Sequence, residues 1–387
     1  MKKFMSIFIC CLLIISCFFT SAFAVNESGG KAPVQVRAKA YVLMDAVTGK
    51  VLLSQNPDQK LYPASVTKIM TMLLVAEALD SGKISFDDKV TASTDAVKKG
   101  GSQIWLKEGE VMSVDELYKA MAVYSANDAC AALAEHVAGS EDAFIVMMNE
   151  RAAQLGMKNT HFENCTGLDD TAENHLTTAF DIALMAKELL THDFVKNYTT
   201  IWMDSLRNGA TELVNTNKLV RFYSGCTGLK TGTTAKAGCC LCASATRENT
   251  SLIAVVLGSD NSTDRFEGAK ALLNFGFANW STVIPQIDPS LITDVSVTMG
   301  EERTITPQIP AAASVLVPKS REKDIVQDIK LAVSVEAPVE SGQVLGHVDV
   351  SLDGQTIGTY QLTAPHYLER LTFGEMFRRL IGLFSKT

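Results

Sequence analysis

The amino-acid sequence predicts an α+β fold in which helices pack against an antiparallel sheet. Two short apolar runs on either side of Thr48-Gly49 indicate a β-hairpin near the start of the folded part. Several amphipathic helical patterns follow, and then come three closely spaced strand patterns and one more helix. Strands joined by short turns pair antiparallel, so this order favours the α+β class over a repeated βαβ unit.

Each predicted element has its own pattern. In the first helix Ile69, Leu73 and Ala76 share one face, and Asp80-Ser81-Gly82 ends the helix. By the same reasoning, helices are predicted over residues 65–79, 114–122, 127–138, 143–155, 178–190 and 264–275. Strands are predicted over residues 40–45, 50–53, 228–233, 239–246 and 252–257.

Length and composition exclude some classes of protein. The chain has 387 residues, of which 47% are hydrophobic and 20% charged, as is typical of a globular protein with two or three domains. Its 35 basic and 43 acidic residues give a formal charge of −8. Because nucleic-acid binding needs clustered cations and the sequence has no basic stripe, we expect no nucleic-acid partner.

The N-terminus has the pattern of an export signal. Two lysines precede an apolar run over residues 4–19, and Ala22-Phe23-Ala24 offers a signal peptidase site. We therefore expect residues 1–24 to be a signal peptide and the mature protein to be exported and extracytoplasmic. Two alternatives stay open: an uncleaved anchor, for which the run is short, and lipoprotein processing at Ile14-Ile15-Ser16-Cys17.

The C-terminal part of the chain differs in composition from the rest. Helical periodicity fades near Pro285, and we expect a small all-β domain over residues 285–364, with a hairpin turn at Asp353-Gly354. Residues 366–387 predict an amphipathic helix with an apolar stripe made of Phe373, Met376, Phe377, Leu380, Ile381 and Phe384. Basic residues opposite the stripe favour anchoring at the outer face of the cytoplasmic membrane, although docking on the protein itself also fits.

The cysteines and histidines do not form a metal-site pattern. Three cysteines lie in the expected signal segment, and six remain: Cys130, Cys165, Cys226, Cys239, Cys240 and Cys242. Cys240 and Cys242 share one face of a predicted strand with no zinc ligands nearby, so we expect them to pack in the core. The six histidines are scattered and no H-E-x-x-H occurs. We expect neither a metal nor a cofactor.

The first of three polar motifs places a serine and a lysine on one helix face. Ser65 begins the predicted helix and Lys68 follows three residues later. Unpaired N–H groups at a helix N-terminus can bind an oxyanion, and a neutral amine can take the serine proton. The spacing alone is weak evidence, because Ser320 and Lys323 repeat it in the β domain. Ser65 is a candidate nucleophile and Lys68 its candidate base.

The second and third motifs are S-x-N and K-T-G. Ser125-Ala126-Asn127 lies between two predicted helices, and alone it would indicate a helix cap. In Lys230-Thr231-Gly232-Thr233, on a predicted strand, the glycine admits a substrate backbone, and the lysine and hydroxyls suit a carboxylate. Alone, Lys230 would be a solvated strand charge. A second S-x-N at Ser259-Asp260-Asn261 follows the K-T-G, so its order excludes it.

The three motifs in this order are far more specific together than apart. From about Ala32 to Phe277 the sequence resembles the low-molecular-mass penicillin-binding proteins, the serine-type D-alanyl-D-alanine carboxypeptidases of peptidase S11 type. The likeness extends to residues 45–50, 164–168 and 227–229. It implies a β-lactamase/DD-peptidase-like domain over residues 32–280, followed by a β domain and a membrane-anchoring helix.

The resemblance also implies a role for each motif residue. Ser65 would attack the carbonyl between the two D-alanines of a peptidoglycan stem pentapeptide, and Lys68 would be the general base. Ser125 would help relay the proton to the leaving D-alanine. The substrate would be bound by Asn127 at its amide and by Lys230, Thr231, Gly232 and Thr233 at its carboxylate, with the N–H groups of Ser65 and Thr233 as the oxyanion hole. β-Lactam antibiotics would acylate the same serine.

One residue that the resemblance leads us to expect is missing from the sequence. Relatives commonly have an arginine at the start of the strand after the K-T-G strand, where it helps to bind the substrate carboxylate. The alignment places Ser251 there, and Arg247, four residues earlier, is an open replacement. The affinity of the protein for the substrate carboxylate therefore depends on a cation that the resemblance does not identify.

Three other functions use the same fold or the same residues. A DD-endopeptidase would cut cross-links with identical groups. A β-lactamase would add a glutamate that activates water; Glu173 is the nearest candidate, and we interpret it as an ordinary loop acid. A non-catalytic wall-binding protein would have damaged motifs, and none is damaged.

Overall fold

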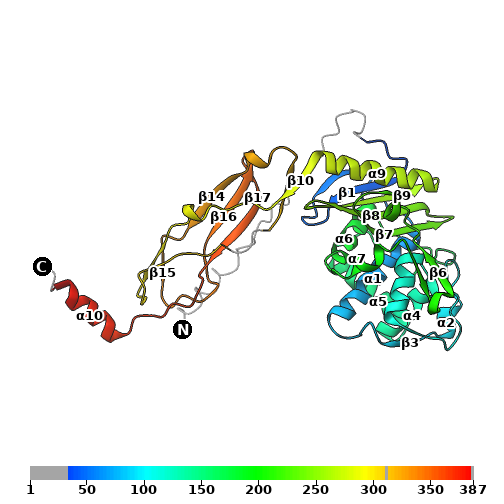
Figure 1. Ribbon diagram of the computed structural model, residues 1–387, viewed down its shortest axis with the longest axis horizontal. Helices are drawn as coiled ribbons and strands as arrows, with labels where there is room; N and C mark the ends of the chain where they lie inside the picture. The colour runs from blue at the N-terminus through cyan, green and yellow to red at the C-terminus, as the bar shows by residue number, and fades with distance from the viewer. Residues whose placement is uncertain (1–33, 310–312, 385–387) are drawn as a thin grey trace, which may run out of the picture. The chain divides into compact units, whose positions relative to one another are not determined.

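The computed structural model describes residues 34–309 and 313–384 (Figure 1), so the expected signal peptide lies outside the described residues. The N-terminal part is an antiparallel sheet with helices on both faces, and the strand order is β2-β1-β9-β8-β7. These strands are β1 (Ala40–Asp45), β2 (Val51–Gln55), β7 (Cys226–Thr234), β8 (Gly238–Arg247) and β9 (Thr250–Ser259). The predicted α+β class is confirmed, and β7 is an edge strand.

The long helix α9 (Ser262–Asn279) covers one face of the sheet, and a group of helices covers the other (Figure 1). The first face packs on α9, and the short helix α8 (Leu219–Phe222) shares this core through Leu219. The second face packs on the group formed by α1 (Lys68–Asp80), α2 (Thr94–Val97), α3 (Val114–Lys119), α4 (Asn127–Ala138), α5 (Glu141–Gln154), α6 (Ala179–Leu189) and α7 (Val195–Thr199). Two small two-stranded antiparallel sheets, β3 (Lys89–Thr91) with β4 (Val111–Ser113) and β5 (Met203–Leu206) with β6 (Thr211–Val214), complete this part.

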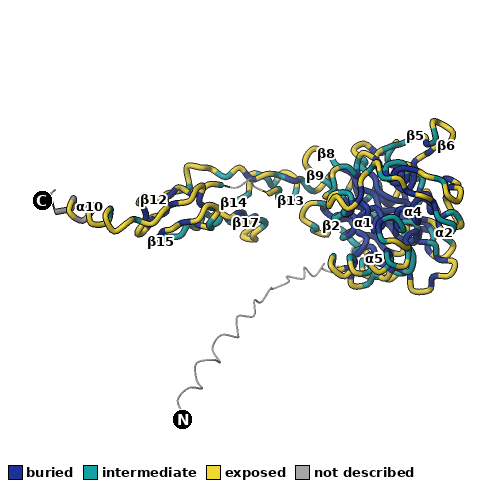
Figure 2. Tube along the Cα trace, turned by 90° about the horizontal axis from the view of Figure 1, so that it is seen from below, coloured by how far each residue is buried: buried dark blue, intermediate teal, exposed yellow. Residues whose placement is uncertain are grey.

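The alternation of side chains along β8 explains both cores. Leu241 and Ala243 face α9, whereas Cys240 and Cys242 belong to the core under the helical group. The C-x-C pair is therefore packed on one face. Helix α1 is the centre of that core, and its residues 68–76 are all buried (Figure 2). Because α1 is apolar on nearly all sides, it is a central helix and not a surface one.

Two helix boundaries differ from the prediction. Ser65 lies in a 3₁₀ turn, η1 (Ala64–Thr67), and the α-helix itself begins at Lys68. The helix predicted over residues 114–122 becomes α3 and then a π-helical turn, η2 (Ala120–Tyr124), which ends at Ser125 in the left-handed region, with φ +67°. Such irregular turns re-aim the backbone at defined points, and periodicity does not reveal them.

The C-terminal part contains small sheets and a final helix. The chain enters it through β10 (Trp280–Val283), which pairs with β13 (Val315–Pro318) at the border predicted between the two domains. The other strands are β11 (Val295–Thr298), β12 (Thr304–Ile305), β14 (Val326–Leu331), β15 (Ser334–Glu336), β16 (Val344–Leu352) and β17 (Gln355–Thr363). β16 and β17 form a hairpin that turns at Asp353-Gly354. The last described element is α10 (Phe373–Phe384). Among the described helices, none combines the length and apolarity needed to cross a bilayer.

Candidate functional site

The first motif brings an amine and a hydroxyl into contact. Lys68 Nζ lies 3.1 Å from Ser65 Oγ and donates a hydrogen bond of 2.8 Å to the backbone oxygen of Thr166. Lys68 has no exposed surface, although it is a lysine at the first residue of α1. The Thr166 carbonyl therefore holds the amine against the serine.

The surroundings of Lys68 favour its neutral form. Burial lowers the pKa of Lys68, and only the sulfur atoms of Cys130 and Cys165 oppose this effect. No carboxylate of the described residues forms an ion pair with Lys68, so no acidic partner compensates for the lost hydration of an ammonium. A neutral amine next to a serine hydroxyl can accept its proton, which makes the serine a nucleophile.

The turn that carries Ser65 is enclosed by two glycines from distant segments. A Cβ at Gly167 would lie 1.8 Å from the backbone oxygen of Ala64, and a Cβ at Gly232 would lie 2.9 Å from the backbone nitrogen of Ser65. Ala64 itself has φ +49°, which is strained for an alanine. The loop at residues 164–168 and strand β7 thus contact the turn through backbone, without side chains between them.

The K-T-G strand adds cations to the site. Lys230 is fully buried, and its Nζ donates to the backbone oxygen of Thr231 at 3.0 Å. Burial lowers the pKa of Lys230 strongly, and the positive charges of Lys68 and Arg265 lower it further. Lys230 and Arg265 therefore lie where the carboxylate of a substrate would be stabilised.

The second motif is joined to the K-T-G strand through Thr216. The Thr216 hydroxyl accepts a hydrogen bond from Thr231 Oγ1 at 2.7 Å. The backbone N–H of Thr216 donates to the backbone oxygen of Val123, which lies two residues before Ser125. Ser125 is nearly buried, and among the described residues its hydroxyl makes no hydrogen bond with Ser65 or Lys68. The structure thus links the Ser125 turn to β7, but a substrate or water is needed to complete a proton path.

Asn127 is the first residue of α4 and presents one free acceptor. Its Nδ2 donates to the oxygen of Gly100 at 2.6 Å, whereas its Oδ1 is buried and has no partner within the described part of the chain. An unpaired buried oxygen is costly unless a ligand satisfies it. Asn127 Oδ1 is therefore available to a substrate N–H group.

Sequence reasoning missed the cation that contacts the K-T-G strand. Arg265, in the first turn of α9, donates from Nη1 to Thr233 Oγ1 at 2.8 Å and to the oxygen of Gly232 at 2.9 Å. The guanidinium is mostly buried, and its Nε has no partner among the described residues. One signal was present, because an arginine in the first turn of a helix opposes the helix dipole and needs another reason to be there.

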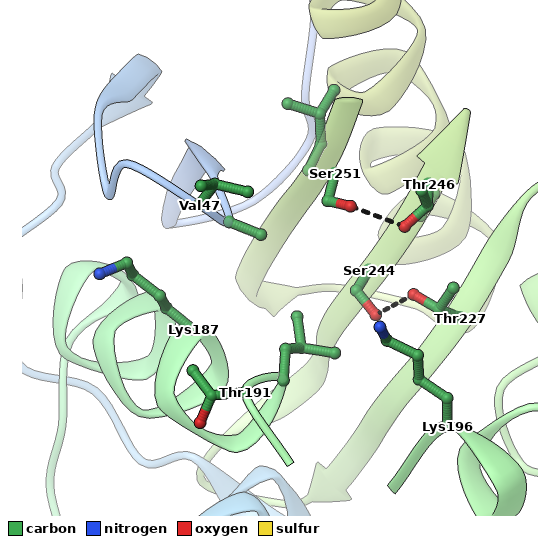
Figure 3. A pocket seen from close by; sticks show the side chains of 12 residues that line it. Val47, Lys187, Thr191, Lys196, Thr227, Ser244, Thr246 and Ser251 are labelled. Carbon is green, nitrogen blue, oxygen red and sulfur yellow. Dashed lines mark hydrogen bonds between the residues drawn. The ribbon is translucent and has the colours of Figure 1, made fainter. Parts of the chain in front are cut away.

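The two positions considered for this arginine lie elsewhere. Arg247 donates to the oxygen of Ser224 at 3.2 Å and stacks over the rings of Tyr223 and Phe277. The Ser251 hydroxyl lies 2.8 Å from that of Thr246 at a separate pocket of about 290 Å³ (Figure 3). None of the predicted site residues lines this pocket. Neither residue contacts the K-T-G strand in the way that Arg265 does.

A buried histidine supports the serine turn from behind. His175 Nδ1 accepts a hydrogen bond of 3.0 Å from the N–H of Glu163, so its Nε2 carries the proton and donates to Thr67 Oγ1 at 2.8 Å. Burial lowers the pKa of His175 to about 4. Glu173, two residues earlier, is exposed, and its backbone oxygen accepts a hydrogen bond from the Tyr62 hydroxyl.

Comparisons with known proteins give a consistent result. Residues 26–261 match the family described as D-alanyl-D-alanine carboxypeptidase, and residues 288–370 match the C-terminal domain of penicillin-binding protein 5. The chain is 38% identical to D-alanyl-D-alanine carboxypeptidase DacF of Bacillus subtilis (strain 168), over 100% of both chains. It is similar to the structure of penicillin-binding protein 5 from Haemophilus influenzae, with TM-score 0.76 and 33% identity over 88% of this chain and 100% of that chain. It is also similar to penicillin-binding protein D2 from Listeria monocytogenes in its ampicillin-bound form, with TM-score 0.58 and 32% identity over 62% of this chain and 98% of that chain.

The lowered pKa of His175 predicts a loss of stability in acid. The neutral ring contributes fully above its unfolded-state pKa of 6.5, and this contribution is lost as the pH falls toward 4, because the unfolded chain binds the proton first. The group accounts for about 2 kcal/mol of unfolding free energy between pH 7 and pH 5. Urea unfolding at both pH values should show a steeper loss for the parent than for His175→Gln. An equal loss of unfolding free energy in the two proteins would contradict a neutral, buried His175.

Proposed function

This chain belongs to the D-alanyl-D-alanine carboxypeptidase family and is a serine-type carboxypeptidase of that class, and we propose that Ser65 is its nucleophile. The observation that carries the proposal is the contact of 3.1 Å between Ser65 Oγ and a buried Lys68 amine that has no counter-ion among the described residues. The amine takes the hydroxyl proton while Ser65 Oγ forms a bond to the carbonyl carbon between the two D-alanines. The backbone N–H groups of Ser65 and Thr233 stabilise the oxyanion.

Collapse of the tetrahedral intermediate completes the acylation. The C–N bond to the last D-alanine breaks, and its nitrogen receives a proton through Ser125 from the Lys68 ammonium. The remaining peptide stays esterified to Ser65, and water then cleaves the ester and regenerates the hydroxyl. The left-handed backbone at Ser125 supports this role, since strained residues are retained where they aim a functional group.

Two sets of groups hold the substrate in this proposal. The unpartnered Asn127 Oδ1 accepts the N–H of the substrate amide. The terminal carboxylate is bound at the K-T-G strand by Lys230, Thr231, Gly232 and Thr233, with Arg265 supplying a permanent positive charge beside Thr233. Arg265 thus supplies from α9 the cation that the resemblance placed at the start of a strand.

We propose a peptidoglycan stem pentapeptide as the substrate and β-lactams as covalent inhibitors of Ser65, as the ampicillin-bound relative supports. A DD-endopeptidase would use the same groups on a cross-linked peptide, and comparing pentapeptide trimming with dimer cleavage separates the two. An efficient β-lactamase is less well supported. Glu173 is exposed, and none of the hydrogen bonds of the described residues joins its carboxylate to the site.

We propose that the mature enzyme begins after residue 24, acts outside the cytoplasm and binds the membrane surface through α10. Its domains would be a DD-peptidase domain over residues 32–280 and a β domain over residues 285–364. The support for the membrane contact is the set of exposed apolar side chains on α10, namely Phe373, Met376, Phe377 and Ile381. Phe373 and Phe377 stack with ring centroids 6.4 Å apart. A helix with such a stripe gains free energy when the stripe enters the lipid interface.

The nucleophile is tested by labelling with a fluorescent penicillin. Ser65→Ala should abolish both the label and D-alanine release, because no other group in the site forms the ester. Ser320→Ala is the matched control, since Ser320 begins the second S-x-x-K of the chain and should have no effect. Label on the Ser65→Ala protein, or an adduct found elsewhere by mass spectrometry, would refute the assignment. Label that persists for many minutes on the parent would exclude an efficient β-lactamase.

The carboxylate-binding cation is tested by comparing two arginines. Arg265→Ala should lower kcat/KM for a D-Ala-D-Ala peptide by about 30- to 150-fold, the equivalent of about 2–3 kcal/mol for a lost charge-assisted hydrogen bond. Arg247→Ala should change it less than threefold, as its guanidinium stacks on Tyr223 away from the K-T-G strand. Thermal melting of both variants measures any general loss of stability. A larger effect at Arg247 would reverse the assignment.

The membrane contact is tested by flotation of the mature chain with anionic phospholipid vesicles. Phe377→Asp places a charge in the apolar stripe and should release most of the protein from the vesicles. Val333→Asp changes another exposed apolar residue, which is 92% exposed in the C-terminal part, and should leave flotation unchanged. Equal flotation of the parent and Phe377→Asp would show that α10 does not bind lipid.

A further inference from the structure

Trp105 projects from the protein although both of its neighbours are buried. It is 75% exposed, the highest value among the large apolar residues of the segment 34–309, whereas Ile104 is 2% and Leu106 is 6% exposed. Its backbone has φ +58°, a region that a bulky residue seldom adopts. An exposed tryptophan on a strained backbone gains nothing from core packing, so a functional explanation is needed.

The backbone on both sides of Trp105 is held rigidly. The carboxylate of Asp128 is fully buried and accepts hydrogen bonds from the N–H of Ile104 at 3.2 Å and from the N–H of Leu106 at 3.0 Å. Arg207 donates to the oxygen of Ile104 at 2.9 Å and forms an ion pair with Glu110. A ring presented by a rigid backbone loses little conformational entropy when it binds a ligand.

The same loop lies directly against Asn127. The N–H of Asn127 donates to the oxygen of Ser102 at 2.7 Å, and its side chain donates to the oxygen of Gly100 at 2.6 Å. A Cβ on Gly101 would lie 2.7 Å from Asn127 Nδ2. Asp128, which holds Trp105, is the next residue after Asn127. Hydrogen bonds to Asn127 and Asp128 therefore hold the loop that carries Trp105 next to the residue with the free Oδ1.

We infer that Trp105 is a substrate-binding residue whose ring receives the side chain of the stem-peptide residue that precedes the two D-alanines. This inference depends on the proposed function and adds a specificity to it. In a stem peptide that residue is a diamino acid, whose alkyl chain ends in an ammonium. The amide proposed to bind Asn127 is the one that joins this diamino acid to the first D-alanine. Its side chain thus starts beside the Trp105 loop, and a tryptophan face attracts both an alkyl chain and a cation.

The test compares three tripeptides by D-alanine release. They are acetyl-L-Lys-D-Ala-D-Ala, its Nε-acetylated form, and acetyl-L-Ala-D-Ala-D-Ala. The parent should prefer the free-ammonium peptide over the alanine peptide by about 5- to 10-fold in kcat/KM. Trp105→Ala should reduce this ratio to about 1, because kcat/KM for the free-ammonium peptide falls more than kcat/KM for the alanine peptide. Trp105→Phe, which keeps an aromatic face, should retain most of the preference.

The controls separate this inference from a structural effect. Val146→Ala alters another exposed apolar residue, which lies on α5, and should leave the ratio unchanged. Trp105→Ala with the parental ratio, or with equal losses on all three peptides, would overturn the inference. A parent with equal kcat/KM for the three peptides would also overturn it, whereas a parent that releases no D-alanine from any of them would overturn the proposed function itself.

Discussion

The contact between the Lys68 amine and the Ser65 hydroxyl is the interaction on which the rest of the site depends. It needs a lysine that is fully buried at the centre of the helical core, where an ammonium would be poorly solvated. Within residues 34–309 and 313–384, the lysine has no carboxylate partner, and its amine is held by one backbone oxygen, that of Thr166. Had an acid been its partner, the amine would stay protonated and could not act as a base.

The other parts of the site follow from this arrangement. The Lys68 amine is held by the backbone oxygen of Thr166, so the loop at residues 164–168 must pack closely on the serine turn. This packing leaves no room for a Cβ at Gly167. Gly232 has the same effect on the opposite side, so β7 approaches Ser65 closely. Lys230 and Arg265 then add positive charge at β7, which suits an anionic substrate.

Much of the fold could be predicted from local patterns, and much of the contact network could not. The bounds of α4 agree with the helix predicted over residues 127–138, and the five strands of the main sheet were all identified, because periodicity and turn residues act locally. Arg265 and Thr216 were missed because their partners on β7 are set by how distant elements pack. Trp105 was missed because a single exposed aromatic residue does not form a periodic pattern in the sequence. The π-helical turn before Ser125 likewise has no signature in the spacing of apolar residues.

The residues of the site come from segments that are far apart in the chain, and this has a consequence for biogenesis. Ser65 is contacted by the backbone of β7, which begins about 160 residues later in the chain, and β7 is contacted by Arg265, which follows it by about 30 residues. Non-local pairings form late, because the chain must close long loops first. A precursor threaded through a translocation channel from its N-terminus would therefore have no working site until nearly the whole catalytic domain had emerged. Its reactive serine would stay latent during transport.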